Sequence, residues 1–92
     1  MIRTFADKAT KKLFETDEYV SEWNQIKKVA KRKLFQLAIA KSLMELAGSG
    51  NRLESLRGER RGQYSIRIND QFRICSIWEK GYAYEVEIVD YH

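Results

Sequence analysis

The chain has 92 residues, a formal net charge of +4, one cysteine, one histidine and no proline. This length suits one compact domain over residues 1–92, and a single cysteine cannot form an internal disulfide. One cysteine with one histidine is too sparse a ligand set for structural zinc, and no apolar stretch is long enough to span a bilayer. The N-terminus also lacks the apolar segment of a signal peptide. We therefore expect a cytoplasmic protein with no metal ion, no cofactor and no membrane partner.

The first half of the chain has the periodicity of helices. Residues 1–5 predict a short strand, and Asp7 is a suitable N-cap for a short helix directly after it. A long helix is predicted from about Ser21, because apolar residues recur at helical spacing and form one stripe. The stripe consists of Trp23, Ile26, Ala30, Leu34, Leu37 and Met44. Residues 48–50 predict the end of this helix, since glycine adopts the left-handed conformation common at helix C-termini.

The second half predicts a loop and three strands. The loop has about a dozen residues, which is longer than most connections and makes it a candidate for function. Strands are predicted at 63–68, 72–78 and 82–89, joined by short turns at 69–71 and 79–81. Short turns favour an antiparallel meander. The predicted fold is α+β, with the N-terminal short strand and two helices packed on one face of an antiparallel-rich sheet.

Alternation along the strands assigns residues to two faces of this sheet. The side chains expected to face the helices are Tyr64, Ile66, Ile68, Tyr84, Val86 and Ile88. The side chains expected on the open face are Ser65, Arg67, Arg73, Glu85 and Glu87. A sheet with one polar, uncovered face can present charged groups to a ligand.

The basic residues between positions 52 and 73 are all arginines. They are Arg52, Arg57, Arg60, Arg61, Arg67 and Arg73. A planar guanidinium donates two hydrogen bonds to one phosphate and stacks on bases, so this preference favours a nucleic-acid ligand. Basic clusters are also common on solvated surfaces, and the clustering alone does not choose between these interpretations.

The chain ends in Asp90, Tyr91 and His92, directly after the last predicted strand. An imidazole with its ordinary pKa of about 6.5 can take and give protons near neutrality. Residues two apart in an extended chain point to the same side, so Asp90 can orient His92. Tyr91 then points to the other side, with Arg73 and Arg67. An ordinary polar strand end and a solvated chain terminus are the alternative interpretations.

The order and spacing of several segments carry a resemblance to a known family. These segments are 53–58 (LESLRG), 62–68 (GQYSIRI), 72–74 (FRI), 81–84 (GYAY) and 89–92 (VDYH). The chain resembles the HigB family of toxins within the RelE/ParE superfamily, and the match extends to Ile2, Phe5 and residues 11–15. The resemblance implies a RelE-like β-α-α-β-β-β fold.

The resemblance also implies a function. HigB-like toxins are ribosome-dependent endoribonucleases that cut mRNA in the decoding site, and a HigA-type helix-turn-helix antitoxin neutralises them. Operator DNA is then a partner only through the antitoxin complex. Two alternatives share the fold: a ParE-like toxin that inhibits DNA gyrase by binding, and a non-catalytic module that binds nucleic acid or a protein partner. The terminal residues 90–92 favour the ribonuclease, because a gyrase binder needs no proton donor there.

By position, the resemblance assigns the active site to Glu54, Arg57, Asp90, Tyr91 and His92, together with Arg73. Two of these residues depart from the family pattern, since Glu54 stands in place of a histidine and Arg57 in place of a lysine. The pair Gln63-Tyr64 likewise stands where the family commonly has Tyr-Trp.

Cleavage of RNA by its own 2′-hydroxyl needs groups that move protons and groups that stabilise phosphate charge. We expect His92 to be the principal general acid or base, with Tyr91 as a stacking or hydrogen-bonding partner and Glu54 as the complementary base. The residues expected to bind RNA phosphate are Arg57, Arg73, Arg60, Arg61 and Arg67.

Overall fold

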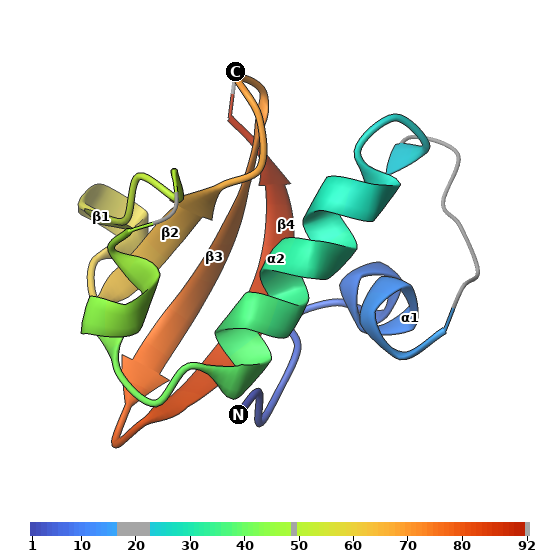
Figure 1. Ribbon diagram of the computed structural model, residues 1–92. Helices are drawn as coiled ribbons and strands as arrows, with labels where there is room; N and C mark the ends of the chain where they lie inside the picture. Colours follow the sequence, from blue (N-terminus) through green and yellow to red (C-terminus); the bar gives the residue numbers. More distant parts are fainter. Residues whose placement is uncertain (17–22, 49, 92) are drawn as a thin grey trace.

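The computed structural model describes residues 1–16, 23–48 and 50–91 (Figure 1). Its helices and strands follow one another as α1 (Lys8–Glu15), α2 (Lys27–Ile39), the 3₁₀ helix η2 (Leu43–Leu46), β1 (Glu54–Ser55), the 3₁₀ helix η3 (Gly58–Arg60), β2 (Gln63–Arg67), β3 (Phe72–Glu79) and β4 (Tyr82–Asp90). Within these residues the strands form a four-stranded antiparallel sheet in the order β1-β2-β3-β4. The predicted α+β fold and antiparallel meander are confirmed.

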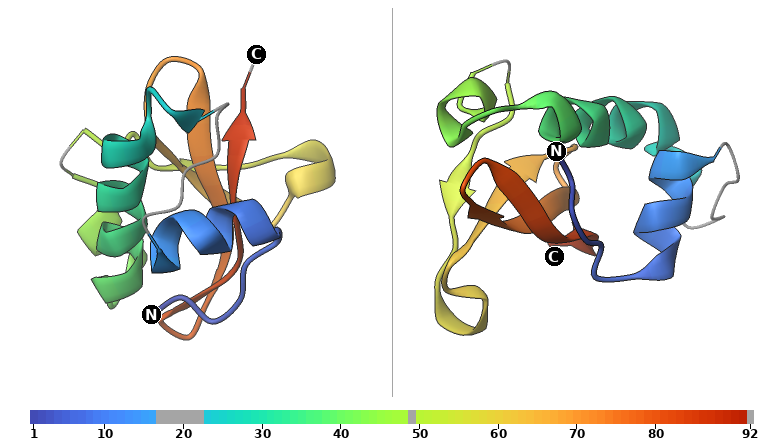
Figure 2. Two further views of the ribbon diagram at one scale, coloured as in Figure 1. Left: turned by 90° about the vertical axis from the view of Figure 1, so that its right-hand side faces the viewer. Right: turned by 90° about the horizontal axis from the view of Figure 1, so that it is seen from below.

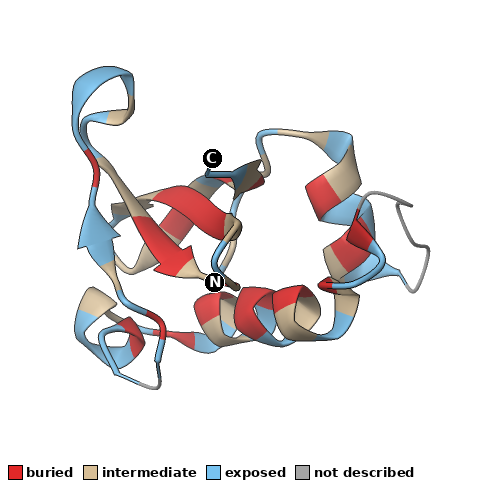
Figure 3. Cartoon of the chain, turned by 90° about the horizontal axis from the view of Figure 1, so that it is seen from above, coloured by how far each residue is buried: buried red, intermediate tan, exposed pale blue. Residues whose placement is uncertain are grey.

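Both α-helices pack on the same face of the sheet. Figure 2 shows α2 crossing this face with α1 beside it, whereas among the described residues only the short 3₁₀ helix η3 lies toward the opposite side. Buried residues gather where the helices and the sheet face one another (Figure 3). The core contains Leu13 from α1, Ala30, Leu34 and Leu37 from α2, and Ile66, Ile74, Val86 and Ile88 from the sheet. No helix in the described part of the chain is long and apolar enough to cross a bilayer.

The cap predicted for the first helix is confirmed. The backbone N–H of Thr10 donates to the Asp7 carboxylate at 2.6 Å, which satisfies a donor that has no partner inside the helix. The hydroxyl of Thr10 is fully buried and accepts from the Ile88 backbone N–H at 3.1 Å. Thr10 therefore takes part in the N-cap of α1 and also links α1 to β4.

The predicted bounds of the long helix are wrong. The helix α2 begins at Lys27, and the expected start at Ser21 lies outside the described residues. It ends at Ile39, because Ala40 is extended and its N–H makes the last helical bond to Gln36. Met44 lies in η2 with 82% of its surface exposed, so it does not continue the apolar stripe. The predicted end of the helix at residues 48–50 therefore comes after η2 and not after α2. The break after α2 lets the chain turn, and Leu46 is buried against the core.

The predicted N-terminal strand is reduced to two isolated parallel bridges, Ile2 with Ala83 and Phe5 with Val86. Between these bridges the partner strand β4 contains an extra residue, Glu85, whose φ is +52°. This bulge interrupts the regular ladder, and the Glu85 N–H bonds instead to the hydroxyl of Thr4 at 2.8 Å. Residues 1–5 still lie beside β4, as Figure 2 shows, but they do not form a regular strand.

The same bulge corrects the face predicted for Tyr84. Pairing shifts between Cys75 and Ile77 on β3, so that Ile77 faces Tyr84 and Trp78 faces Ala83. Trp78 and Ala83 both belong to the core side, and Tyr84 therefore points to the open face. One inserted residue reverses every later side chain of a strand, and the sequence pattern alone does not reveal the insertion.

The long loop predicted before the sheet contains regular structure. Residues 54–55 form β1, in which Glu54 pairs with Ser65 and Ser55 with Tyr64. After β1 the Leu56 N–H donates to the Gln63 carbonyl at 2.9 Å, and η3 follows directly. This loop is therefore an edge of the sheet, and it holds Glu54 against β2.

Lys33 of α2 is buried, with 5% of its surface exposed, although it carries a charge. Burial lowers the pKa of its ammonium from the usual 10.5, and the charge of Arg32 lowers it further. The unfolded chain therefore binds more protons than the folded chain between the lowered pKa and 10.5, and stability rises with pH through that window. Below the window the full penalty for burying the charge is present.

We expect Lys33→Met to raise the free energy of unfolding by about 1 kcal/mol near neutral pH, because it removes a buried charge. The gain should shrink as the pH approaches 10.5. Urea denaturation of both proteins at neutral and alkaline pH measures it. Lys28→Met, at an exposed position of the same helix, is the control. A loss of stability in Lys33→Met at neutral pH would contradict the expectation.

Candidate active site

Arg73 lies near the start of β3, on the face of the sheet that no α-helix covers, and several acceptors hold its side chain in place. Its Nε donates to the hydroxyl of Ser65 at 2.7 Å. Its Nη2 donates to the backbone carbonyls of Arg52 and Ser65. Only 9% of the residue is exposed, so these bonds form in a largely dry environment where they restrain the side chain strongly. The guanidinium therefore has a fixed orientation, with Nη1 directed away from these anchors.

The carboxylate of Glu54 faces this free end of the guanidinium. The distance from Arg73 Nη1 to Glu54 Oε1 is 3.8 Å, which makes a loose ion pair. Glu54 reaches this place because β1 pairs it with Ser65, the residue that anchors Arg73. More than half of the Glu54 side chain is exposed, so the carboxylate can move aside for an anionic ligand.

A small cavity of about 240 Å³ opens at this point. It is lined by Arg52, Glu54, Arg67, Asn69, Asp70, Arg73 and Tyr91. The cavity thus combines a tyrosine and three arginines with two carboxylates, all from the open face or the turns beside it. Such a surface offers donors for phosphate oxygens and an aromatic ring for a base.

Tyr91 enters the cavity directly after the end of β4. Its backbone N–H donates to the Gln71 carbonyl at 2.6 Å, which holds the chain against the turn between β2 and β3. Burial raises the pKa of the Tyr91 hydroxyl, whereas the positive charges of Arg60 and Arg73 oppose this effect. The hydroxyl therefore stays protonated near neutrality and is available as a hydrogen-bond donor.

The buried Cys75 lies on the same face. Burial raises the pKa of its thiol, whereas a side-chain hydrogen bond with Tyr91 is among the effects that lower this pKa. The cysteine was expected to be a small buried residue, and this is confirmed. Its protonated thiol gives the tyrosine a neutral neighbour. In residues 1–16, 23–48 and 50–91, no three His, Cys, Asp or Glu side chains gather as a ligand set for a metal ion.

Besides Arg73, two further predicted phosphate-binding arginines are paired with carboxylates. Arg60 Nη1 donates to Glu87 at 2.7 Å and to Gln63 at 3.0 Å. The hydrogen bond with Glu87 raises the pKa of Arg60, so the guanidinium keeps its charge. Arg67 donates to Asp70, and this bond holds the pKa of the exposed Asp70 carboxyl below its usual value.

The structure brings together some of the predicted site residues and leaves others apart. Glu54, Arg67, Arg73 and Tyr91 line one cavity. Arg57 and Arg61 are exposed on either side of η3 and do not line it. Asp90 is exposed and accepts from the Gln71 side chain at 3.0 Å, outside the cavity lining. His92 lies outside the described residues.

The sequence patterns did not identify the residues that support Arg73. Ser65 was placed on the open face, but nothing in its spacing indicated that its hydroxyl accepts from Arg73. The carbonyl of Arg52 accepts from Arg73, and the backbone of Arg52 is in the left-handed region, with a φ of +47°. Asn69 and Asp70 were expected only as turn residues, although both line the cavity.

We expect Ser65→Ala to lower the free energy of unfolding by about 1–3 kcal/mol, because it leaves a buried donor of Arg73 without its acceptor. Chemical denaturation measures this change. Ser76→Ala is a matched control, since Ser76 is also buried but faces the helices through its pairing with Tyr64. Equal losses in the two variants would show that the hydroxyl of Ser65 does not anchor Arg73.

Comparisons with known proteins agree with this fold. A family model described as the RelE-like toxin of the type II toxin-antitoxin system HigB matches residues 3–92. The chain therefore belongs to the HigB-like family of RelE-like toxins of type II toxin-antitoxin systems. No curated protein sequence matches the chain.

Solved structures of YoeB are similar to this chain in fold. The YoeB-YefM complex from Staphylococcus aureus matches with 21% identity and a TM-score of 0.64, over 100% of this chain and 95% of that chain. The YoeB dimer from Staphylococcus aureus matches with 21% identity and a TM-score of 0.62, over 99% of this chain and 94% of that chain. At this identity the likeness supports the RelE-like fold that the sequence predicted.

Proposed function

We propose that this toxin is a ribosome-dependent endoribonuclease that cuts mRNA in the decoding site and thereby inhibits translation. The observation that carries the proposal is the cavity around Arg73. The restrained guanidinium of Arg73, the movable carboxylate of Glu54 and the neutral phenol of Tyr91 meet there. In the sequence, His92 follows Tyr91 directly. These are the groups that cleavage of an RNA phosphodiester requires at the phosphate and beside the base.

The reaction uses the 2′-hydroxyl of the RNA as the nucleophile. A base removes the proton of the 2′-hydroxyl, and its oxygen forms a bond with the adjacent phosphorus while the bond to the 5′-oxygen breaks. An acid then supplies a proton to the departing 5′-oxygen, which leaves a 2′,3′-cyclic phosphate on one fragment. This chemistry proceeds with protein side chains that move protons and stabilise the added phosphate charge.

The residues of the cavity suit distinct roles in this reaction. Arg73 directs Nη1 at the phosphate, because its other nitrogens are bonded to Ser65 and Arg52. Tyr91 donates a hydrogen bond or stacks on a base. His92, the only histidine, is the principal group for proton transfer.

Glu54 is the complementary base in this proposal. Its carboxylate sits 3.8 Å from Arg73 Nη1, where a phosphate oxygen would also bind. The incoming phosphate must therefore displace Glu54 from the arginine, and the freed carboxylate is then beside the sugar hydroxyl. The competition weakens binding of substrate in the ground state.

The remaining arginines contact the RNA backbone on either side of the cavity. Arg57 and Arg61 are exposed, so their guanidinium groups can donate to phosphate oxygens of the RNA backbone. Arg60 and Arg67 exchange Glu87 and Asp70 for phosphate when RNA binds. Asp90 has a supporting role, which is to orient His92.

The proposed partners follow from the family. A HigA-type helix-turn-helix antitoxin neutralises the toxin, and operator DNA is bound only through their complex. The ribosome supplies the mRNA, so the toxin acts in the cytoplasm.

Primer extension on mRNA with programmed ribosomes tests the proposal. A cut within the codon in the decoding site, absent without ribosomes, is the expected result. Intact message combined with blocked DNA supercoiling by gyrase would support the ParE-like alternative instead. Intact message with unaffected gyrase would point to a binding module without catalysis.

A further inference from the structure

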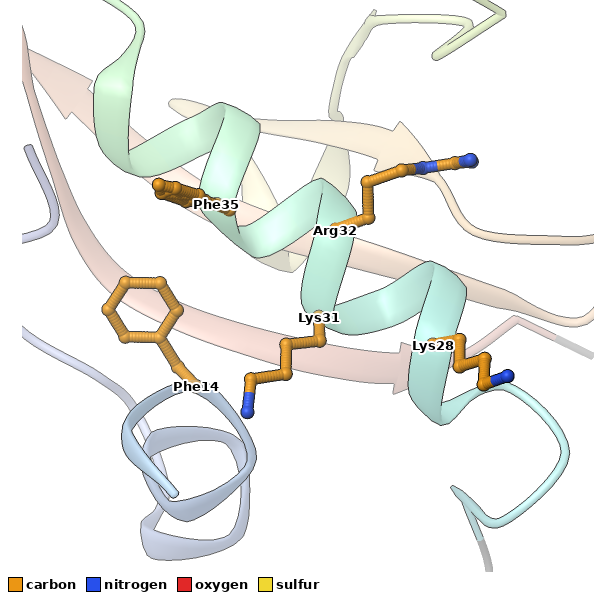
Figure 4. Close-up of a pocket in the computed structure, with 5 residues that line it drawn as sticks. All are labelled: Phe14, Lys28, Lys31, Arg32 and Phe35. Carbon is orange, nitrogen blue, oxygen red and sulfur yellow. The ribbon is translucent and has the colours of Figure 1, made fainter. Parts of the chain in front are cut away.

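The helix α2 contacts different surroundings on different sides. Its buried side packs into the core through Ala30, Leu34 and Leu37. Another side borders the aromatic groove, a hollow of about 590 Å³ between the two α-helices that is lined by Phe14, Lys28, Lys31, Arg32 and Phe35. Figure 4 shows the rings of Phe14 and Phe35 at this groove, whereas Arg32 points away from α1. Gln36 stands four residues after Arg32, on the same side of α2, and this side contacts the loop before β1.

Asn51 is the residue of this loop that Gln36 contacts. The Asn51 Nδ2 donates to Gln36 Oε1 at 3.2 Å and to the backbone carbonyl of Leu46, also at 3.2 Å. Only 1% of Asn51 is exposed, and hydrogen bonds shielded from water restrain a side chain strongly. Its Oδ1 is buried and has no hydrogen-bond partner in the part of the chain that the structure describes. The two bonds donated by Nδ2 therefore set the orientation of this side chain.

The backbone around Asn51 has an unusual conformation. Gly50 and Arg52, on either side of Asn51, have φ values of +73° and +47°. Glycine adopts such values readily, whereas a residue with a Cβ keeps them only where surrounding bonds hold the backbone. Asn51 supplies such bonds, because its carbonyl accepts from the Arg67 N–H at 2.6 Å in addition to the bonds of its side chain. Asn51 therefore holds the turn in which Arg52 lies.

This turn matters for the cavity because the Arg52 carbonyl anchors Arg73. The Nη2 of Arg73 donates to that carbonyl, while Nε donates to the hydroxyl of Ser65. Asn51 directly precedes Arg52, so a change in the backbone of Asn51 moves the anchor. A chain of bonds thus runs from Gln36 in the helix layer, through Asn51 and the Arg52 carbonyl, to Arg73 on the face that no α-helix covers.

We propose that Asn51 is a positioning residue for Arg73. It lies outside the cavity lining and acts through the Arg52 carbonyl, which keeps Nη2 occupied and leaves Nη1 directed at Glu54 in the cavity. The effect of Asn51 on cleavage rests on the proposed function. Its effect on the Arg73 side chain depends only on the bonds of the folded chain.

NMR of the full chain with ¹⁵N-labelled arginine tests the effect on Arg73 directly, through exchange of its Nε–H with solvent. We expect Asn51→Ala to accelerate this exchange by about tenfold, because Arg73 loses a fixed anchor and its side chain opens more often. Gln36→Met removes one of the two acceptors of Asn51 and should accelerate exchange by about threefold, so it carries the same test if Asn51→Ala does not fold. Thr10→Val is the matched control, since it removes another buried hydrogen bond, between α1 and β4, and should leave this exchange unchanged.

Single-turnover cleavage of mRNA on programmed ribosomes tests the consequence for the reaction. We expect Asn51→Ala to lower the rate at saturating ribosomes by about tenfold, with little change in the ribosome concentration that gives half of that rate. In an Arg73→Lys background the same substitution should cost less than about twofold, because lysine has no fork for the Arg52 carbonyl to hold. Thr10→Val should cleave within about twofold of wild type.

Several results would overturn the proposal. Unchanged Arg73 exchange in folded Asn51→Ala and Gln36→Met would show that the Arg52 carbonyl holds its place without Asn51. Equal acceleration in Thr10→Val would reduce Asn51 to a contributor to overall stability. A full tenfold loss of rate in the Arg73→Lys background would mean that Asn51 acts elsewhere than on Arg73. If the wild-type toxin does not cleave mRNA, the proposed function fails, and the exchange measurement still decides the role of Asn51.

Discussion

Replacing His92 with alanine is expected to slow mRNA cleavage on programmed ribosomes by about 10²- to 10⁴-fold, the usual effect of losing a general acid or base. The chain has no other histidine to take over the proton transfer. Tyr91, which precedes His92 in the sequence, lines the Arg73 cavity. Single-turnover cleavage with saturating ribosomes measures the chemical step without contributions from product release.

The pH dependence separates a chemical role from a structural one. The wild-type rate should change with pH around the ordinary imidazole pKa of about 6.5, and the residual rate of His92→Ala should lose that dependence. Tyr91→Phe is a useful comparison, because it keeps the ring and removes the hydroxyl while leaving His92 intact. A His92→Ala toxin that cleaves at the wild-type rate would remove histidine from the reaction.

Replacing Arg73 with lysine is expected to slow cleavage by about 10²- to 10³-fold, the range seen when a donor to a developing negative charge is lost. Lysine keeps the charge, but a single ammonium cannot bind Ser65 and the Arg52 carbonyl while also pointing at a phosphate. The guanidinium does both, since its anchors occupy Nε and Nη2, whereas Nη1 has only the loose ion pair with Glu54 in the cavity.

The control for this substitution is Arg61→Lys, which makes the same change at an exposed arginine outside the cavity lining. Its cleavage rate should stay within about threefold of wild type, because a mobile backbone contact depends mainly on charge. Thermal denaturation of both variants establishes that they are folded at the assay temperature. Equal rates for Arg73→Lys and wild type would show that cleavage does not need the anchored guanidinium of Arg73.

The carboxylate of Glu54 gives this cavity an unusual charge balance for a site that we propose to bind RNA. Its neighbours Arg52, Arg67 and Arg73 are cations, yet Glu54 and Asp70 offset part of their charge. The family pattern has a histidine at the position of Glu54, which would add to the positive charge instead. If the proposed function is right, this partial neutralisation lowers the attraction of the cavity for phosphate, and we expect cleavage to rely on the ribosome to position the mRNA.

The alternating pattern of the strands predicted the structure around the site better than the apolar stripe predicted the helices. Alternation along 63–68 and 82–89, together with short turns, predicted the meander and the open face that carries Arg67 and Arg73. The same alternation predicted that Tyr91 lies on the side of Arg73, and both line the cavity. Strand pairing follows from local patterns, because each side chain faces one of only two directions.

The helical stripe predicted less, because it also fits a chain that leaves the helix early. Met44 falls at helical spacing from Leu37, yet α2 ends at Ile39 and Met44 is exposed. Tertiary packing determines where α2 ends, because the break at Ala40 allows Leu46 to reach the core. Similarly, the bulge at Glu85 arises where residues 1–5 bond to β4, and no local signal marks it.

The sequence by itself determined which residues could do chemistry and on which face of the sheet most of them lie, because residue type and alternation are local properties. Only the tertiary structure decided how Arg73 is held, since its anchors come from the loop at Arg52 and from β2 at Ser65. It also decided that the aromatic groove between α1 and α2 faces solvent. Both features depend on contacts between segments distant in the chain, which become neighbours only when the helices and the sheet pack together.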